Sequence, residues 1–372
     1  MTSRGASRRL LSLDVFRGIT IAGMILVDCA GSAVVHPLLR HAVWNGWTLA
    51  DLVFPSFLVI MGASLVLSLS RRVARGESLP LLSFQIVRRT AVIFAFGLLI
   101  SFFIFNPPAA GLRWPGVLQR IAVCYFFCAI IYLSTGPALQ AALCALLLVG
   151  YWLLLTRVPV PGYGAGVLTP QGCLSCYVDR TLLGPHMWYG AFCDPEGILS
   201  TLPALADALL GVLAGHWLIS RGRTHVQKAR RMAAAGALAV AGGLLWSRWL
   251  PMNKHIWTSS YALFAGGLAL MGLSACYWAI EIREVSAWGR PFEVFGRNPL
   301  LSYFLSGLFY GVQQFLHPSW AGGLSLERWI NARFFASWLS PMNASLAYAV
   351  AYLLVCLAGM SVLHKKKLFL KF

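Results

Sequence analysis

The sequence contains few charged residues, and acids are especially scarce. Only 12 of its 372 residues are Asp or Glu, and charged residues of both signs make up 11% of the chain. Soluble domains carry about 25% charged residues, so this chain has too few to cover a water-exposed surface. The shortage therefore argues against a soluble protein.

The sequence also lacks the regular alternation of polar and apolar residues that marks the strands of a membrane β-barrel. Its hydrophobic residues, 58% of the chain, fall in long blocks instead. A helix needs ~20 such residues to cross a bilayer, and it satisfies its own backbone hydrogen bonds there. We therefore predict an all-α integral membrane protein, a single bundle of about ten transmembrane helices. The expected spans are 13–35, 48–70, 90–106, 116–134, 138–156, 202–220, 232–250, 258–280, 298–316 and 343–363.

The net charge of +18 is compatible with a nucleic-acid partner, but the distribution of the basic residues favours another explanation. We predict that both termini are cytoplasmic, because most Lys and Arg residues then fall in cytoplasmic segments and in the basic tail 364–372. This asymmetry follows the positive-inside rule. We therefore expect contact with membrane lipid and no nucleic-acid partner. The short connections favour a bacterial inner membrane as the location.

The connections are too short to form a second soluble domain, so residues 1–372 are expected to be one membrane domain. The longest connection, about 157–201, lies on the outer side and is rich in Gly, Pro, Tyr and Trp. Long connections in compact proteins are usually functional or disordered, and this one is too aromatic for disorder. It is therefore predicted to form an ordered cap over the extracytoplasmic face.

The nine cysteines are scattered, and most lie in or near predicted spans, where they are expected to be small core residues. Cys173, Cys176 and Cys193 fall together in the outer connection. The Cys-x-x-Cys pair has no second pair, so no metal site is expected. One disulfide among the three is predicted if the loop faces an oxidising compartment, and its pairing is left open.

Ionisable residues inside a membrane cost several kcal/mol and persist mainly for function. Asp28 falls near the outer end of the first span and Asp51 near the outer start of the second, with His41 in the connection between them. A histidine held against buried carboxylates is the usual construction of a general base. The competing interpretation is an inert loop histidine.

Three other segments place polar groups at helix ends. Arg120 lies at the start of the fourth span, where it is costly unless paired. Residues 251–261 bring Asn253, Lys254 and His255 to an outer helix entrance, although an ordinary interfacial belt has a similar composition. Residues 295–299 place Arg297 and Asn298 at an inner helix start, where the helix dipole favours an anion.

Taken together and in order, these segments resemble the heparan-α-glucosaminide N-acetyltransferase family, which includes bacterial membrane homologues of the NagX type. The matching pieces are S-L-D-V-F-R-G (12–18), R-H-A-V-W-N-G-W-T-L-A-D-L-V-F-P (40–55), I-M-G (60–62), R-W-P-G-V-L-Q-R (113–120), D-P-E-G-I-L-S-T (194–201), N-K-H-I-W-T-S-S-Y (253–261) and G-R-N-P-L (296–300). The likeness extends from residue 12 to about residue 310.

The resemblance implies acetyl transfer from cytosolic acetyl-CoA to the amine of a glucosamine-like sugar on the far side of the membrane. It places the family's active-site histidine at His41, and it implies a homodimer. At Asp28 the sequence departs from the animal enzyme, which commonly has Asn there. An Asp can orient His41 electrostatically, whereas an Asn can only hydrogen-bond.

These arguments assign roles to specific residues. His41 is the general base or a transient acyl carrier, and Asp51 and Asp28 orient it. The residues predicted to bind the acceptor or the oxyanion are Asn45, Asn253, Lys254, His255, Ser259, Asp179, Asp194, Glu196 and Trp188. The residues predicted to bind acetyl-CoA are Arg88, Arg89, Arg120, Arg290, Arg297 and Asn298. Ordinary positive-inside charge is the competing interpretation for the arginines of the inner face.

Two other functions compete with this one. A sugar or proton-coupled transporter also buries acids and lines a site near the midplane of the membrane. An O-acetyltransferase acting on cell-envelope glycans needs the same donor and a similar base. The outer position of the polar cluster and the lack of a convincing repeat between the two halves argue against transport.

Overall fold

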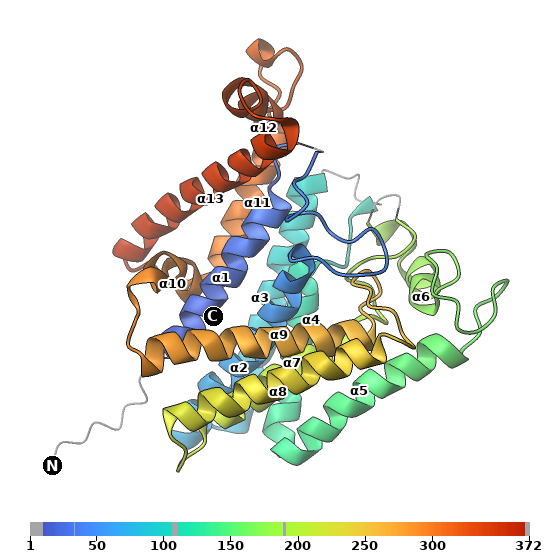
Figure 1. Cartoon of the computed structure of the whole chain (residues 1–372), viewed down its shortest axis with the longest axis vertical. Helices are drawn as coiled ribbons and strands as arrows, with labels where there is room; N and C mark the ends of the chain where they lie inside the picture. Colours follow the sequence, from blue (N-terminus) through green and yellow to red (C-terminus); the bar gives the residue numbers. More distant parts are fainter. Residues whose placement is uncertain (1–9, 33, 106–110, 189–190, 369–372) are drawn as a thin grey trace.

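A computed structural model describes residues 10–32, 34–105, 111–188 and 191–368 (Figure 1). In these ranges the regular secondary structure is helical, apart from one isolated bridge between Val160 and Gly164. The prediction of an all-α fold is confirmed. The last part of the predicted basic tail, 369–372, lies outside the described residues.

The helices follow the long apolar blocks of the sequence. In chain order they are α1 (Leu11–Asp28), α2 (Val53–Ala74), α3 (Leu79–Phe105), α4 (Val117–Ser134), α5 (Pro137–Arg157), α6 (Leu174–Leu183), α7 (Thr201–Ile219), α8 (His225–Trp246), α9 (Ser259–Tyr277), α10 (Arg290–Arg297), α11 (Pro299–Phe315), α12 (Leu326–Ile330) and α13 (Pro341–Lys365). A short 3-10 turn, Ala50–Leu52, leads directly into α2.

Each predicted span coincides with one of the long helices, but not all of these helices are equally apolar. Within the described residues, seven helices are long and apolar enough to cross a membrane: α2, α3, α4, α5, α7, α9 and α13. The other three differ for identifiable reasons: α1 contains Asp14, Arg17 and Asp28, α8 begins among basic residues, and α11 has 17 residues. The larger number of spans and the orientation of the termini stay predictions.

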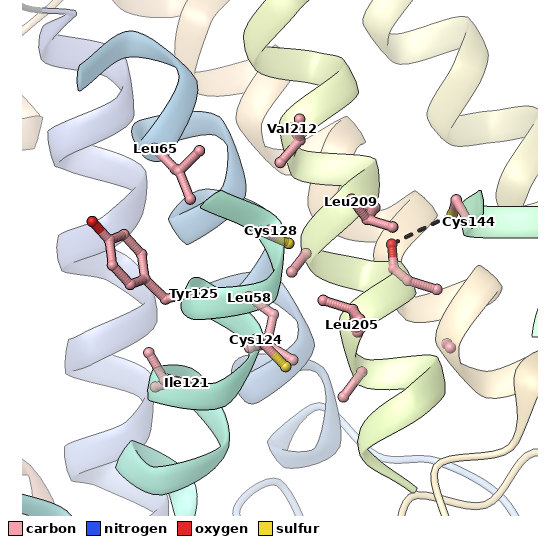
Figure 2. Packing of buried hydrophobic residues seen from close by; sticks show 14 of the residues in the cluster. Leu58, Leu65, Ile121, Cys124, Tyr125, Cys128, Cys144, Leu205, Leu209 and Val212 are labelled. Carbon is pink, nitrogen blue, oxygen red and sulfur yellow. Dashed lines mark hydrogen bonds between the residues drawn. The ribbon is translucent and has the colours of Figure 1, made fainter. Parts of the chain in front are cut away.

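The centre of the bundle is formed by α2, α4 and α7, with α5 against α7 (Figure 2). Figure 2 shows α4 presenting Cys124 and Cys128 toward the side chains of α7. The thiol of Cys144 on α5 points at the carbonyl of Ala206, 3.5 Å away. These cysteines are buried, as expected for small core residues.

Glycines allow α2 and α7 to approach very closely. A Cβ atom added at Gly62 would lie 2.0 Å from the carbonyl oxygen of Ala208, and one added at Gly211 would lie 1.9 Å from that of Val59. Only a residue without a side chain fits such a contact, which is a common device between membrane helices. The contact holds the two helices that carry the buried acids Asp51 and Asp207 in fixed relation.

The connection between α5 and α7, residues 158–200, folds around α6 and is named the α6 segment. Figure 1 shows α6 above the end of α5 that leads into this connection. Cys176 and Cys193 form a disulfide, and Cys173 is a free, buried thiol beside them. The disulfide predicted among these three residues is therefore present. That this segment caps the extracytoplasmic face stays a prediction.

Candidate active site

His41 and Asp51 form a hydrogen-bonded pair at the start of α2. Nδ1 of His41 lies 2.7 Å from Oδ1 of Asp51. The Asp51 side chain is completely buried, whereas the His41 side chain is 39% exposed. A buried carboxylate that accepts Nδ1–H fixes the imidazole tautomer and leaves Nε2 as the basic nitrogen. The predicted base therefore has the required geometry.

Asp51 also organises the loop that carries His41. Its Oδ2 accepts hydrogen bonds from the backbone N–H of Ala42 (3.2 Å), the N–H of Thr48 (3.0 Å) and the Thr48 hydroxyl (3.0 Å). A carboxylate three residues after Thr at a helix start commonly reaches back in this way. The backbone carbonyl of Asp51 accepts a hydrogen bond from the Tyr261 hydroxyl at 2.5 Å. Both oxygens of Asp51 are thus used to position the histidine loop.

Lys254 completes the cluster from the loop between α8 and α9. Its Nζ lies 3.0 Å from Nδ1 and 3.3 Å from Nε2 of His41, and 3.5 Å from Oδ1 of Asp51. Because Nζ is nearly equally far from the two ring nitrogens, it does not occupy the lone-pair direction of Nε2, which stays the basic nitrogen of the ring. The sequence predicted Lys254 as an acceptor-binding residue, and the structure places it against His41.

The neighbouring polar residues join the His41 loop to the Lys254 loop. The side chain of Asn253 donates to that of Asn45 (3.2 Å), and Nε2 of His255 lies 3.1 Å from the carbonyl of Ala42. The His255 ring also stacks on Trp44, with centroids 5.5 Å apart, and burial lowers the pKa of His255. These predicted acceptor-binding residues therefore hold the two loops together.

Two predicted site residues lie apart from this cluster. The Ser259 hydroxyl donates to the carbonyl of Leu148 at 2.7 Å. Asp28, at the end of α1, accepts from the Tyr303 hydroxyl at 3.5 Å. Among the described hydrogen bonds none joins Asp28 to His41, although Asp28 interacts electrostatically with His41 and Lys254. Asp28 therefore meets the base through charge.

A cavity of about 230 Å³ lies between α1, α2, α3, α4 and the start of α11, where Tyr303 lines it. Its polar lining includes Arg17, Arg89, Arg297, Asn298 and Tyr303, and the rest of its wall is largely apolar. The hydroxyl of Tyr303 donates to Asp28, the acid that interacts electrostatically with His41 and Lys254. Three of the predicted acetyl-CoA residues are therefore brought together. The sequence analysis did not assign Arg17 or Tyr303 to this site.

The other arginines predicted for acetyl-CoA lie elsewhere. Arg88 and Arg290 are exposed and are not among the residues that line the cavity. Arg120 is buried, and it donates to the carbonyl of Gly197 (3.0 Å) and to the hydroxyl of Ser200 (2.5 Å). Its position ties α4 to the start of α7.

Arg113 binds two acids of the α6 segment, Asp194 and Glu196. The Arg113 guanidinium donates to both carboxylate oxygens of Asp194 (2.8 and 2.5 Å) and to Glu196 (2.5 Å). The Trp188 ring covers the guanidinium at 4.6 Å, and its backbone N–H donates to Asp194 at 2.8 Å. Burial opposes the charge, but the hydrogen bond to Asp194 and the charge of Glu196 raise the pKa of Arg113. Asp194 is completely buried, and its hydrogen bonds to Arg113 and Trp188 hold this segment together.

Asp179 on α6 is also completely buried. One oxygen accepts from the backbone N–H of Ile198 at 2.9 Å. A Cβ atom added at Gly197 would lie 2.0 Å from the other oxygen, so the turn needs glycine there. Burial, together with the charge of Asp194, raises the pKa of Asp179 to about 6.

The raised pKa of Asp179 predicts a pH-dependent stability. Between pH ~4 and pH ~6 the folded state holds a proton that the unfolded state has lost, so stability falls as pH rises and levels off above ~6. The expected fall is about 3 kcal/mol for a shift of about two pKa units. Asp179→Asn, which keeps the oxygen that accepts from Ile198, should flatten this part of the unfolding profile. An unchanged slope in the variant would contradict the assignment.

His41 and Asp51 lie in a region of the chain that matches a known protein family. The model of the family described as "Heparan-alpha-glucosaminide N-acetyltransferase, catalytic" matches residues 9–247, which include His41, Asp51 and the α6 segment. The chain belongs to this family. The resemblance inferred from the sequence motifs is thus confirmed.

Two curated relatives carry the name heparan-alpha-glucosaminide N-acetyltransferase. The human protein is 33% identical over 353 residues, which cover 79% of this chain and 52% of the relative. The mouse protein is 31% identical over 360 residues, which cover 81% of this chain and 54% of the relative. The chain therefore spans about half the length of the curated relatives it matches. The family match extends past the loop that carries His41 and includes α7 and α8.

Proposed function

We propose that this protein is a membrane-bound N-acyltransferase that moves the acetyl group of cytosolic acetyl-CoA to the amine of a glucosamine-like sugar on the other side of the membrane. One observation carries the proposal: a His41–Asp51–Lys254 cluster interacts electrostatically with Asp28, whose hydrogen-bond partner Tyr303 lines a cavity that also contains three arginines. The family membership and the name of the relatives support the same reaction.

The geometry supplies the groups that acetyl transfer to an amine requires. Nε2 of His41 takes a proton as the amine nitrogen attacks the thioester carbonyl and the C–N bond forms. Collapse of the intermediate breaks the C–S bond, and the imidazolium returns the proton to the departing CoA thiolate. Asp51 stabilises the imidazolium, and the Lys254 ammonium donates to the oxyanion. In a second form of the proposal Nε2 attacks the thioester, the C–S bond breaks and CoA leaves as the thiolate. The amine then attacks the acetyl-imidazolium, the bond to Nε2 breaks, and the amine proton passes to the CoA thiolate.

The donor would occupy the cavity with its thioester directed toward Tyr303 and Asp28. Drug-sized ligands occupy pockets of roughly 300–1,000 Å³, so this cavity, at about 230 Å³, fits the pantetheine arm and not the whole donor. Arg17, Arg89 and Arg297 would hold phosphate or carbonyl oxygens by charge-assisted hydrogen bonds. The nucleotide would then lie outside the cavity, at the inner face.

The acceptor would enter from the side of the α6 segment. The Trp188 ring is 45% exposed and offers a flat face for a sugar ring. Glu196 lies beside it in the Arg113 cluster.

The protein would be a homodimer in a bacterial inner membrane. Lipid would surround α3, α5 and α13, the candidate spans with the smallest buried share.

The proposal is tested with purified protein, acetyl-CoA labelled in its acetyl group, and glucosamine. We expect label in an amide that resists mild base. Label in a base-labile ester would identify the O-acetyltransferase instead. Uptake of sugar into proteoliposomes without any dependence on acetyl-CoA would favour the transporter.

Arg89 and Arg88 are adjacent on α3 and make a matched pair of variants for the donor site. Arg89→Gln should raise the KM for acetyl-CoA about 10- to 100-fold, because a hydrogen bond to a charged group contributes about 1.5–3 kcal/mol. Arg88→Gln, which changes an exposed side chain outside the cavity, should leave that KM within about 3-fold of the original. Equal effects of the two substitutions on KM would remove the cavity from the donor site.

A further inference from the structure

Asp207, in the middle of α7, is a buried acid that the proposed reaction does not use. Its side chain is completely buried, and its Oδ2 accepts a hydrogen bond from the indole N–H of Trp257 at 2.8 Å. Trp257 belongs to the loop between α8 and α9 that also carries Lys254. A membrane helix is thus joined through one hydrogen bond to the loop that supplies part of the active site.

Trp257 has a backbone conformation that tryptophan rarely adopts. Its φ is +48°, in the left-handed region, and its side chain is completely buried. Bulky residues persist in this region only where their surroundings hold them, at a cost of roughly 1–3 kcal/mol. Its ring packs edge-on against Phe54 (5.1 Å between centroids) and Tyr261 (5.4 Å), and the Arg120 guanidinium lies 5.0 Å from its centre. The ring is therefore fixed from several sides.

The turn from Asn253 to Thr258 connects this ring to the catalytic cluster. The backbone N–H of Trp257 donates to the carbonyl of Lys254 at 3.1 Å, and that of Thr258 donates to the carbonyl of Asn253 at 3.0 Å. The Thr258 hydroxyl accepts from the N–H of Asn253 at 3.0 Å. Lys254 and Trp257 thus sit in one closed turn, one against His41 and the other against Asp207.

We propose that Asp207 is a positioning residue: by accepting the Trp257 hydrogen bond it holds the 253–258 turn in the conformation that sets Lys254 against His41. Arg120 lies over the same ring and also binds Gly197 and Ser200, so the start of α7 supports the turn from a second direction. A change in kcat on loss of this hydrogen bond rests on the proposed acetyl transfer. A change in the position of Lys254 does not, because it can be measured without any reaction.

Three variants separate the hydrogen bond from mere space filling. Asp207→Leu keeps the size of the side chain and removes the acceptor, Trp257→Phe keeps a ring and removes the donor, and Asp207→Asn keeps an acceptor oxygen. A displacement of about 1 Å in a catalytic group costs up to about 100-fold in rate, so the first two variants should lose about 10- to 100-fold in kcat. The KM for acetyl-CoA should stay within about 3-fold, and Asp207→Asn should retain most of the wild-type kcat.

The position of Lys254 is measured without any acetyl transfer by competitive labelling with an amine-reactive ester. Mass spectrometry compares Lys254, whose side chain is 14% exposed, with the exposed Lys365 at the end of α13 in the same molecule. We expect Lys254 to be labelled slowly in the wild type and in Asp207→Asn. In Asp207→Leu and Trp257→Phe it should be labelled several-fold faster relative to Lys365.

The outcomes distinguish this inference from the proposed function. If the wild type transfers no acetyl group but the labelling pattern appears, the proposed function fails and the positioning role stands. If Asp207→Leu and Trp257→Phe label Lys254 at the wild-type rate, the positioning role is overturned. If Asp207→Leu does not fold, Trp257→Phe decides the question against Asp207→Asn by the same two measurements.

Discussion

Replacing His41 with Ala is expected to reduce kcat for acetyl transfer by about 10²- to 10⁴-fold, the usual contribution of a general base. The imidazole is the group in the cluster with a free basic nitrogen, since Nδ1 is bound to Asp51 and Lys254 carries only donors. Its removal takes one partner from the buried Asp51, which keeps Lys254 at 3.5 Å and the groups on its other oxygen, so the loss of stability should be small beside the loss of activity. Single-turnover assays with labelled acetyl-CoA and glucosamine measure the loss.

His36→Ala is the matched control for this prediction. It lies in the same loop, and its Nδ1 accepts from the backbone N–H of Leu38 at 3.2 Å, away from the cluster. It should retain full activity. Asp51→Asn should approach the effect of His41→Ala, since an amide at this position can stabilise the wrong tautomer of the imidazole. Wild-type turnover in His41→Ala would require another base.

Incubation of the wild-type protein with acetyl-CoA alone separates the two forms of the proposed mechanism. If His41 carries the acetyl group, incubation with acetyl-CoA alone should add an acetyl group to the peptide that contains it. If His41 acts as a base, no labelled peptide accumulates, and amide forms only when both substrates are present. Rapid quenching followed by mass spectrometry of the peptide decides between these alternatives.

Replacing Arg113 with Met is expected to destabilise the protein by about 3–5 kcal/mol, because it leaves buried charges without their partner. In the wild type the guanidinium binds both oxygens of the completely buried Asp194 and one of Glu196. Asp194 also receives N–H groups from Trp188 and Glu196, which depend on the same arrangement. The measurement is the free energy of unfolding in detergent, followed by intrinsic fluorescence.

Arg180→Met provides the control within the same segment. Arg180 donates to the backbone carbonyls of Pro170, Gln171 and Phe192 at 2.8–3.2 Å and pairs with no acid in these contacts. Arg180 is only partly buried, so water can replace these hydrogen bonds, and its loss should cost about 1 kcal/mol in total. Neutralising the stranded acids, as in Arg113→Met with Asp194→Asn, should restore part of the stability. If Arg113→Met were no less stable than Arg180→Met, the buried cluster would not be holding this segment.

The sequence by itself determined the helical class, the positions of the long helices and the pairing of His41 with Asp51. The first two follow from composition, because a block of ~20 apolar residues in lipid has few alternatives to a helix. The pairing is local: the two residues are 10 positions apart, and Thr48 and the start of α2 fold the intervening loop around the carboxylate. Short-range hydrogen bonds of this kind can be recognised from spacing.

Only the tertiary structure decided the rest of the site. Lys254 reaches His41 across 213 positions of sequence, and Arg113 meets Asp194 across 81. Asp207 was not singled out from the sequence, and it meets its partner Trp257 across 50 positions. An apolar span can turn any of its faces toward its neighbours, so the face that packs depends on contacts such as those of Gly62 and Gly211. Which polar groups meet in the bundle therefore depends on helix packing, which residue spacing within one segment does not specify.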